Sequence, residues 1–426
     1  QMNARSRKAL VFLFASNIIS GFAQGITMLS IPWSIISLPG GRLINPIMVS
    51  VVTLASLFWG LYAGTLIDRY NRKHVFLVMN GADFLILCLL ALLGYQFGVG
   101  FILLSLAFMV TIFTYNVHFP NLYAFVQELF EPSYYARVNS AIEIQGQFTN
   151  FLGMMIGGLL LDGTYGLEWW PESMHFAAWD LWQIFLMDGL TYLVAFALIT
   201  QIPYDRQRKI TIDTGTLRQR LRQGFQYLSE NRPLFIFGVS SHVIFFSLMV
   251  LIQVVAPVYV AEYLFESASV LAFFKGFYAI GAITAGFLGL SMFVRRNNLI
   301  SEVITLLITA GLLFIILSLT RSVLVTWLSG IVLGICNAGA RILRITYIVR
   351  IVPNRVVGRV NSIFAVINVL MRVIFAGVMA IPFFSDEGNG ENIVYGMIIL
   401  SVVMLVSAAA LIFNFQRFDQ DAAVGE

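Results

Sequence analysis

The fold is decided by the stretch GLYAGTLIDRYNRK, residues 60–73. An apolar run ends here and gives way within a few residues to one carboxylate, Asp68, and three cations, Arg69, Arg72 and Lys73. A compact turn of this kind at a membrane face can hold two helical bundles together. A purely solvated charge cluster would explain Arg69 and Lys73, but it would not explain Asp68 or the glycines of the stretch. We therefore interpret the stretch as a charged turn that follows an apolar segment and can hold helices together.

Apolar residues dominate the chain on both sides of this loop. They make up 59% of the 426 residues, and charged residues make up 11%, compared with about 25% charged residues in a soluble domain. Stretches of about 20 apolar residues, long enough to cross a bilayer, recur along the whole length. We predict twelve spans, near 9–38, 46–67, 75–94, 101–127, 138–161, 181–201, 233–261, 269–294, 299–319, 323–349, 360–384 and 393–415.

A tetrapeptide occurs twice. Arg137-Val138-Asn139-Ser140 returns as Arg359-Val360-Asn361-Ser362. Each copy is predicted in a short polar loop after the fourth span of its half, behind Pro132 or Pro353, and before a long apolar helix. Two related halves of about six spans are typical of secondary transporters.

The predicted fold is therefore all-α and membrane-integral, with twelve transmembrane helices in two pseudo-symmetric six-helix bundles. We expect an N-terminal bundle at 1–202, a cytoplasmic amphipathic linker at 203–232 and a C-terminal bundle at 233–426. The linker alternates Leu217, Leu221, Phe225 and Leu228 with arginines, which predicts a basic helix at the membrane surface.

The loop at 60–73 resembles the signature loop of the major facilitator superfamily, Gly-x-Leu-Ala-Asp-Arg-x-Gly-Arg-Lys. Asn71 stands where that family usually has Gly, and because Asn tolerates a left-handed backbone we expect the turn to survive. The resemblance implies that Asp68 docks on the start of the eleventh helix, predicted near the second copy of the repeat. The expected gating residues are Gly60, Gly64, Asp68, Arg69, Arg72, Lys73, Asn361 and Ser362.

Within the superfamily, Gly81-Ala82-Asp83 and the loop 132–140 are similar to the bacterial drug, siderophore and macrolide exporters. The run 153–158, GMMIGG, is similar to the antiporter motif Gly-Pro-x-x-Gly-Gly, with Met154 in place of Pro. Glycines at this spacing are also a common packing device between membrane helices, so both interpretations of the run stay open.

Charge distribution predicts the orientation. With the N-terminus in the cytoplasm, 20 of the 26 lysines and arginines lie in cytoplasmic segments. We expect a bacterial inner-membrane protein with both termini cytoplasmic. The net charge of +4 then reflects topology and gives no reason to expect nucleic acid as a partner.

Ionisable residues inside spans are costly and usually functional. Proton-coupling candidates are Asp83, Glu143 and Asp188. Alternatives remain open for each: Asp83 could pair with cations of the signature loop, Glu143 could close a capping box with Ser140, and Asp188 could reach water at a helix end. Cationic candidates in the second half are Lys275, Arg341, Arg344 and Arg372. Arg372 is predicted near the bilayer midplane.

Neutral polar residues on the helices expected to face a cavity complete the candidate site. With two arginines, the substrate-cavity candidates are Gln24, Thr27, Tyr115, Asn116, His118, Gln147, Asn150, Gln253, Asn337, Arg341, Asn368 and Arg372, and Asn17, Asn121 and Gln145 join them. A lone histidine such as His118 is more often a hydrogen-bonded packing residue. No His, Cys and Asp cluster has metal-ligand spacing, and no phosphate-binding Gly-x-x-x-x-Gly-Lys-Ser/Thr loop is present. We therefore expect no metal, no cofactor and no ATP-driven step.

These features predict a transporter and not an enzyme, since no nucleophile and base pair is legible. We expect a monomer that exports a small amphipathic compound in exchange for protons and is surrounded by membrane lipids. A lipid or lysolipid flippase of the same fold, favoured by the cationic second half, and a non-transporting sensor or scaffold remain alternatives.

Overall fold

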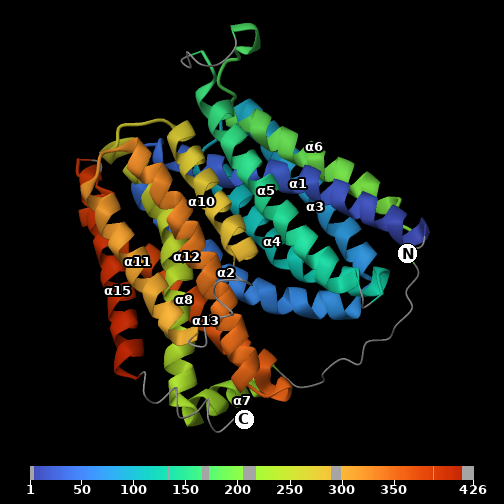
Figure 1. Ribbon diagram of the computed structural model, residues 1–426. Coiled ribbons are helices and arrows are strands. Elements are labelled where there is room, and N and C mark those ends of the chain that lie inside the picture. The colour runs from blue at the N-terminus through green and yellow to red at the C-terminus, as the bar shows by residue number, and fades with distance from the viewer. Residues whose placement is uncertain are drawn as a thin grey trace. The chain divides into compact units, whose positions relative to one another are not determined.

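The computed structural model describes residues 4–131, 134–165, 172–204, 217–288, 299–386 and 388–414, and these are organised almost entirely as helices (Figure 1). In the first half the helices are α1 (Ala4–Ile36), α2 (Gly41–Arg69), α3 (Arg72–Phe97), α4 (Phe101–Leu129), α5 (Tyr135–Asp162) and α6 (Leu181–Thr200). They are followed by α7 (Leu217–Glu230), α8 (Arg232–Val250), α9 (Ala256–Val258), α10 (Ala268–Leu288), α11 (Leu299–Leu319), α12 (Val323–Ile351), α13 (Asn354–Val378), α14 (Pro382–Ser385) and α15 (Ile393–Phe413).

Each of the twelve predicted spans coincides with a helix, which confirms the predicted fold class. Among the described residues, 11 helices are long and apolar enough to cross a membrane, and α5 carries the remaining predicted span. The seventh span continues from α8 to Tyr263 through two π-helical segments, Leu251–Val255 and Tyr259–Tyr263, on either side of α9.

The two copies of the repeat are helical, so the loops predicted for them were wrong. Helix α5 begins at Tyr135 and α13 at Asn354, directly after Pro353. Ser140 therefore lies inside α5 and cannot be its N-cap, which removes the predicted capping box with Glu143. The side chain of Glu143 lies outside the described residues.

The early start of α13 corrects the expected helix start near Asn361 and the expected position of Arg372 along its helix. Asn361 and Ser362 lie two turns inside the helix, where backbone N–H groups already bond within the helix, and the Ser362 hydroxyl donates to the carbonyl of Gly358 at 2.9 Å. Arg372 lies six residues before the last residue, Val378, and so is not at the middle of its helix.

The chain divides into two compact units. Unit 1 comprises Gln1–Ile212 with Glu266–Gly276, and unit 2 comprises Asp213–Phe265 with Phe277–Glu426. Unit 1 pairs its first span with its fifth (α1 with α5) and its third with its sixth (α3 with α6), and Figure 1 shows α1, α3 and α6 side by side.

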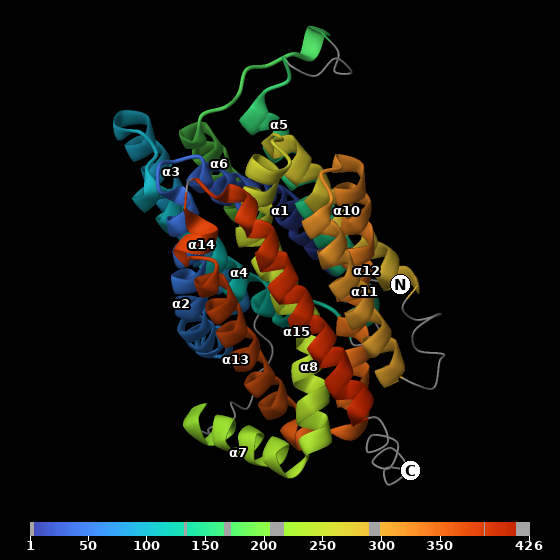
Figure 2. The same cartoon turned by 90° about the vertical axis from the view of Figure 1, so that its left-hand side faces the viewer.

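Unit 2 repeats this pairing. Its first span packs on its fifth (α8 with α13) and its third on its sixth (α11 with α15). The helices of the two units therefore contact one another in the same order, as expected for two pseudo-symmetric bundles. Helix α7 packs on the first turns of α13, as Figure 2 shows, and the two helices are close at Gly224, because a Cβ there would meet the Arg359 carbonyl oxygen at 2.6 Å.

An exposed ion pair joins two connecting segments of unit 2. Arg321, between α11 and α12, donates from Nη2 to Glu391 Oε1 at 2.7 Å, and its guanidinium lies 4.7 Å from the centre of the Tyr263 ring. The hydrogen bond with Glu391 raises the pKa of Arg321. Both side chains are solvent-exposed, so the pair adds little stability.

Glycines of the antiporter-like run form the contact between α1 and α5. A Cβ on Gly153 would meet the Phe22 carbonyl oxygen at 2.2 Å, and one on Gly157 would meet the Ile26 Cα at 3.1 Å. These glycines therefore let two helix backbones approach closely, which supports the packing interpretation.

We expect Gly153→Ala to destabilise the protein by about 1–3 kcal/mol, because the added methyl group overlaps backbone atoms that cannot rotate away. The measurement is thermal unfolding of the purified protein in detergent. Gly146→Ala, on the same helix, is the matched control, since a Cβ there meets nothing within 4 Å. Equal unfolding temperatures for the two variants would contradict close packing at Gly153.

Candidate functional site

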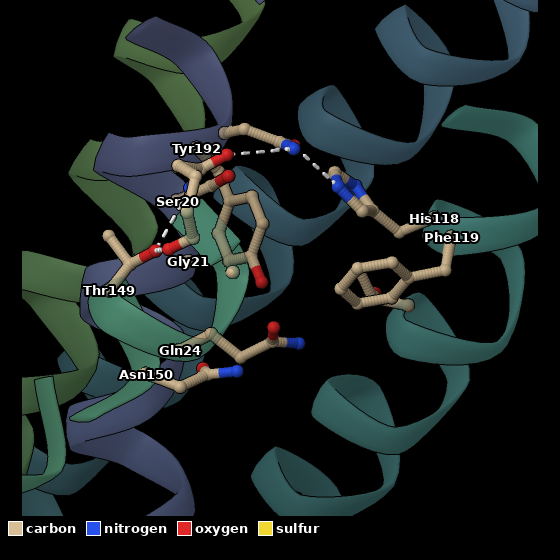
Figure 3. Close-up of a pocket in the computed structure, with 12 residues that line it drawn as sticks. Ser20, Gly21, Gln24, His118, Phe119, Thr149, Asn150 and Tyr192 are labelled. Atoms are coloured by element: carbon tan, nitrogen blue, oxygen red, sulfur yellow. Dashed lines mark hydrogen bonds between the residues drawn. The ribbon is translucent and has the colours of Figure 1, made fainter. Parts of the chain in front are cut away.

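A polar pocket opens in unit 1 between α1, α4, α5 and α6 (Figure 3). Its lining consists mainly of amides and hydroxyl groups, and none of the lining side chains that the structure describes is a carboxylate, a lysine or an arginine. The space has a volume of about 20 Å³, which is room for one or two water molecules and too little for an organic substrate. The lining residues are Asn17, Ser20, Gly21, Gln24, Thr114, His118, Phe119, Gln145, Gly146, Thr149, Asn150 and Tyr192.

A chain of hydrogen bonds crosses the pocket wall. His118 Nε2 lies 2.7 Å from Asn17 Oδ1, Asn17 Nδ2 donates to Gln145 Oε1 at 3.4 Å, and Gln145 Nε2 donates to Thr149 Oγ1 at 2.9 Å. Since an amide oxygen only accepts, His118 donates to it through Nε2. The chain ties together α4, α1 and α5. It presents hydrogen-bonding groups but no fixed charge.

Behind this wall lie two buried carboxyl groups, Asp83 on α3 and Asp188 on α6, which are 5% and 1% exposed. Thr114 Oγ1 donates to both carboxylate oxygens of Asp83, at 2.9 and 2.8 Å, and Thr27 Oγ1 donates to Asp188 Oδ2 at 2.6 Å. The two carboxyl groups are close enough to interact electrostatically. The structure thus brings together two residues that the sequence could only propose separately.

This arrangement corrects three expectations. Asp83 is held by Thr114 on α4 and not by cations of the signature loop. Asp188 does not reach water, because the contact of α6 with α3 covers it; at Gly189, a Cβ would lie 3.0 Å from the sulfur of Cys88. Thr27 is fully buried against Asp188 and does not line the pocket.

Tyr192 and Thr114 were missed by the sequence analysis. Tyr192 follows Asp188 by one helical turn, lines the pocket and interacts electrostatically with both acids. The spacing of Asp188 and Tyr192 could have indicated the tyrosine. Nothing in the sequence distinguishes Thr114 from the other threonines of the spans.

The signature loop uses its cations within unit 1. Arg72 is 3% exposed, and its Nε lies 3.6 Å from Glu128 Oε1, while the hydroxyl of Tyr204 bonds the other oxygen of Glu128. Asn121 Nδ2 donates to the Arg72 carbonyl at 3.0 Å, so Asn121 belongs to this junction and not to the pocket. Glu128 lies at the end of the fourth span and was not predicted as a partner.

Lys73 fastens the same loop to α6. Its Nζ donates to the carbonyl oxygens of Thr200 and Ile202, both at 2.8 Å, and so satisfies groups that the end of a helix leaves free. Arg69 is exposed and lies over the neighbouring Tyr70 ring at 5.9 Å.

The backbone conformation of Asn71 and the surroundings of Gly60 and Gly64 differ from expectation. Asn71 is not left-handed: its φ is −64° and ψ 128°, and its side chain accepts from the His74 N–H as the N-cap of α3. A Cβ on Gly60 or Gly64 would meet nothing within 4 Å. The side chain of Asp68 lies outside the described residues.

Of the remaining cavity candidates of unit 1, Gln24 and Asn150 line the pocket, whereas Tyr115, Asn116 and Gln147 are not among its lining residues. Gln24 Nε2 donates to the Thr111 carbonyl and Asn116 Nδ2 to the Ser56 carbonyl, each at 3.5 Å. Tyr115 is 44% exposed and packs on Phe119, and Gln147 is half-buried.

The candidates of unit 2 are distributed over several helices. Asn337 Nδ2 donates to the Tyr278 hydroxyl at 2.6 Å, and Arg344 Nη1 donates to the Ser241 carbonyl at 3.0 Å. Asn368 and Arg372 share one face of α13, and the Arg372 guanidinium lies 6.0 Å from the Phe245 ring centre. The other two residues are Arg341, which is exposed, and Gln253, which lies in the first π-helical segment.

Lys275, a candidate from the second half of the sequence, is 3% exposed and belongs to unit 1. Among the described residues, no three His, Cys, Asp or Glu side chains are grouped so that they could hold a metal ion.

Comparison with known proteins gives both a family and a fold. The sequence pattern described as Major Facilitator Superfamily matches residues 13–376. No curated protein sequence matches the chain.

Several solved structures are similar. A bacterial homologue of the human lysosomal transporter Spinster, inward-facing and unoccupied, is 14% identical, with 99% of each chain covered and a TM-score of 0.68. A bacterial homologue of the iron transporter ferroportin, inward-facing, is 16% identical, with 95% of this chain and 98% of that chain covered and a TM-score of 0.72. The nucleoside transporter NupG is 13% identical, with 96% and 99% covered and a TM-score of 0.69. At such low identities the likeness shows the fold alone.

Proposed function

Because the chain belongs to the major facilitator superfamily, and is therefore a multi-pass membrane transporter and not an enzyme, we propose that it exports a small amphipathic compound by proton antiport. The compound would be a drug, a siderophore or a metabolite, and transport would proceed by alternating access. The observation that supports proton coupling is the pair of buried carboxyl groups, Asp83 and Asp188, directly behind a polar pocket.

The chemistry of the pair suits a coupling site. An ionised carboxylate within a membrane span is costly, and the electrostatic interaction between the two acids adds repulsion when both are charged. Each carboxyl group is met by a threonine hydroxyl, which can donate to a carboxylate or accept from a carboxylic acid. Asp83 and Asp188 can therefore bind and release a proton while their hydrogen bonds are preserved.

The pocket suits an uncharged part of the substrate. Its amides and hydroxyls form hydrogen bonds in either direction, and Phe119 offers an apolar surface. The pocket has room only for a small polar group of a larger compound, such as a hydroxyl or amino group. We further propose a monomer in the bacterial inner membrane with both termini cytoplasmic, as the distribution of lysines and arginines favours.

Reconstitution into liposomes tests the proposal. With an imposed pH gradient, wild-type protein should drive the flux of at least one compound from a drug, siderophore and metabolite panel, and collapsing the gradient with an ionophore should stop it. The absence of gradient-dependent flux across the panel, with folded protein, would favour a sensor or scaffold.

A lipid or lysolipid flippase is the second candidate. It is favoured by the arginines of unit 2, of which Arg341 is exposed and Arg372 shares a helix face with Asn368, since arginine binds phosphate groups well. Transfer of a labelled lysophospholipid between leaflets, independent of the pH gradient, would support the flippase over the exporter.

The gating role of Asp68 remains a proposal that rests on the family resemblance. The backbone donors that could receive a carboxylate lie at the actual start of α13, in the turn that begins at Asn354 and not at Asn361.

We expect Asp68→Asn to lower the rate of substrate flux about tenfold, because a helix start favours an anion by about 1–2 kcal/mol in a partly buried geometry. Initial rates of flux in proteoliposomes measure the effect. Glu131→Gln, which neutralises an exposed carboxylate near the same membrane face, should keep the wild-type rate. An unchanged rate in Asp68→Asn would exclude the gate.

A further inference from the structure

Thr114 contacts both the polar pocket and the buried carboxyl group of Asp83. It lines the pocket, and its hydroxyl is the group that bonds both carboxylate oxygens of Asp83, at 2.9 and 2.8 Å. The side chain is 6% exposed, so little besides the pocket and the carboxyl group can reach it. Thr27 is the corresponding partner of Asp188, but it is fully buried and does not line the pocket.

A threonine hydroxyl has one proton to donate and two lone pairs that accept. An ionised Asp83 has no proton, so the Thr114 hydroxyl must donate to it, and the pocket then meets only a Thr114 lone pair. When Asp83 takes up a proton, its carboxyl O–H can donate to Thr114 Oγ1. The Thr114 proton is then released from Asp83 and can point into the pocket. One proton is gained by Asp83, and none is lost by Thr114.

We propose that Thr114 converts the protonation of Asp83 into a change of hydrogen-bonding character in the pocket, from acceptor to donor. The pocket then binds a hydrogen-bond donor of the substrate, such as a hydroxyl, amine or amide N–H, while Asp83 is ionised. When a proton binds, the Thr114 proton can turn toward the pocket, where it opposes a donor of the substrate and weakens that contact. This alternation is what exchange of substrate for proton requires, and in this respect the inference rests on the proposed function.

The surroundings of Asp83 bear on its response to pH. Asp188 and Tyr192, on α6, interact with it electrostatically. Cys88 lies one to two turns further along α3, at the contact with Gly189. His118 follows Thr114 by one turn of α4 and already donates to Asn17. Asp188 is the acid among these groups whose charge can compete with the Asp83 proton, so each variant below is compared in the wild-type and the Asp188→Asn background.

The first measurement is independent of substrate and uses the purified full-length protein. Infrared difference spectra between acidic and alkaline buffer show the carbonyl band of protonated Asp83, which is assigned by its loss in Asp83→Asn. We expect Thr114→Val to move this band, because a hydrogen-bond partner is lost, and Thr114→Ser to retain it. Thr27→Val should leave the Asp83 band in place. A band that is unchanged in Thr114→Val would overturn the inference.

The second measurement uses ethidium, an amphipathic dye whose positive charge does not change with pH. One of its aromatic amino groups is small enough to enter the pocket beside Thr114, while the rest of the dye lies outside this space. We expect wild-type binding to weaken about five- to tenfold from alkaline to acidic buffer, the worth of one hydrogen bond. Thr114→Val should abolish this pH dependence, while Thr114→Ser and Thr27→Val should keep it. If Thr114→Val keeps it too, ethidium responds to the Asp83 charge directly and the role of Thr114 is refuted.

The two proposals fail in different ways. If wild-type protein shows no gradient-driven flux, the proposed function fails, whatever the spectra of the Thr114 variants show. If flux is coupled to protons but Thr114→Val behaves as wild type in both measurements, only the role of Thr114 fails.

Discussion

Asp83→Asn and Asp188→Asn are each expected to reduce proton-driven flux in proteoliposomes to the background of empty liposomes. Asparagine has nearly the size of aspartate and still hydrogen-bonds to the Thr114 or Thr27 hydroxyl, so the helix packing should persist. It cannot bind and release a proton, and an exchange cycle that depends on that step stops. The measurement is substrate flux together with proton flux under an imposed pH gradient.

Two controls separate lost coupling from lost structure. Glu266→Gln neutralises an exposed carboxylate of unit 1 and should leave both fluxes unchanged. Exchange of labelled substrate against unlabelled substrate, with no gradient, needs no net proton movement and should survive in Asp83→Asn. Full proton-driven transport in both asparagine variants would show that neither acid couples transport to protons.

The single variants also test whether the two acids act as one site. Groups that share a proton site titrate as a pair, and their substitutions are not additive. If Asp83 and Asp188 act together, either single variant should already lose all proton-driven flux. If they are independent sites, each single variant should keep part of that flux, and only the double variant should lose all of it.

The sequence predicted the elements well because a membrane span leaves a clear pattern. A run of about 20 apolar residues has few alternatives to a helix when no water is present to satisfy the backbone. Helix ends were predicted less well. Arg137 and Arg359 are polar and follow a proline, which suggests a loop, yet both lie in the first turns of α5 and α13.

The candidate site was predicted only in part, because the sequence of one helix does not show which residues of the other helices it contacts. Asp83 and Asp188 were recognisable as costly charges inside spans. Their partners Thr114 and Thr27 were not, since a threonine in an apolar helix is as often bonded to its own backbone, as Thr111 is to the Ala107 carbonyl. Only the packing of α4 on α3, and of α6 on α1, decides which threonine meets a carboxylate.

The contacts of the signature loop were also predicted only in part, because its partners lie on other helices. Its cations were recognised from the family resemblance, but the resemblance gave no partner within unit 1. Arg72 meets Glu128 at the end of α4, and Lys73 meets the last carbonyls near the end of α6. Arg72 and Lys73 therefore attach the start of α3 to α4 and α6, independently of any gating contact.

Arg72→Ala is therefore expected to destabilise the protein by about 3–5 kcal/mol, the effect of removing one partner from a buried ion pair. The side chains of Arg72 and Glu128 are 4% and 17% exposed, so the Glu128 charge would remain largely buried beside Tyr204 without its cation. Unfolding free energies in detergent micelles measure the loss. Glu128→Gln added to Arg72→Ala should recover a large part of the stability, because it removes the uncompensated charge. Arg69→Ala, at an exposed cation of the same loop, should be close to neutral. If Arg72→Ala and Arg69→Ala cost the same, the basic residues of the loop serve topology alone, and the junction at Glu128 does not hold α3 to α4.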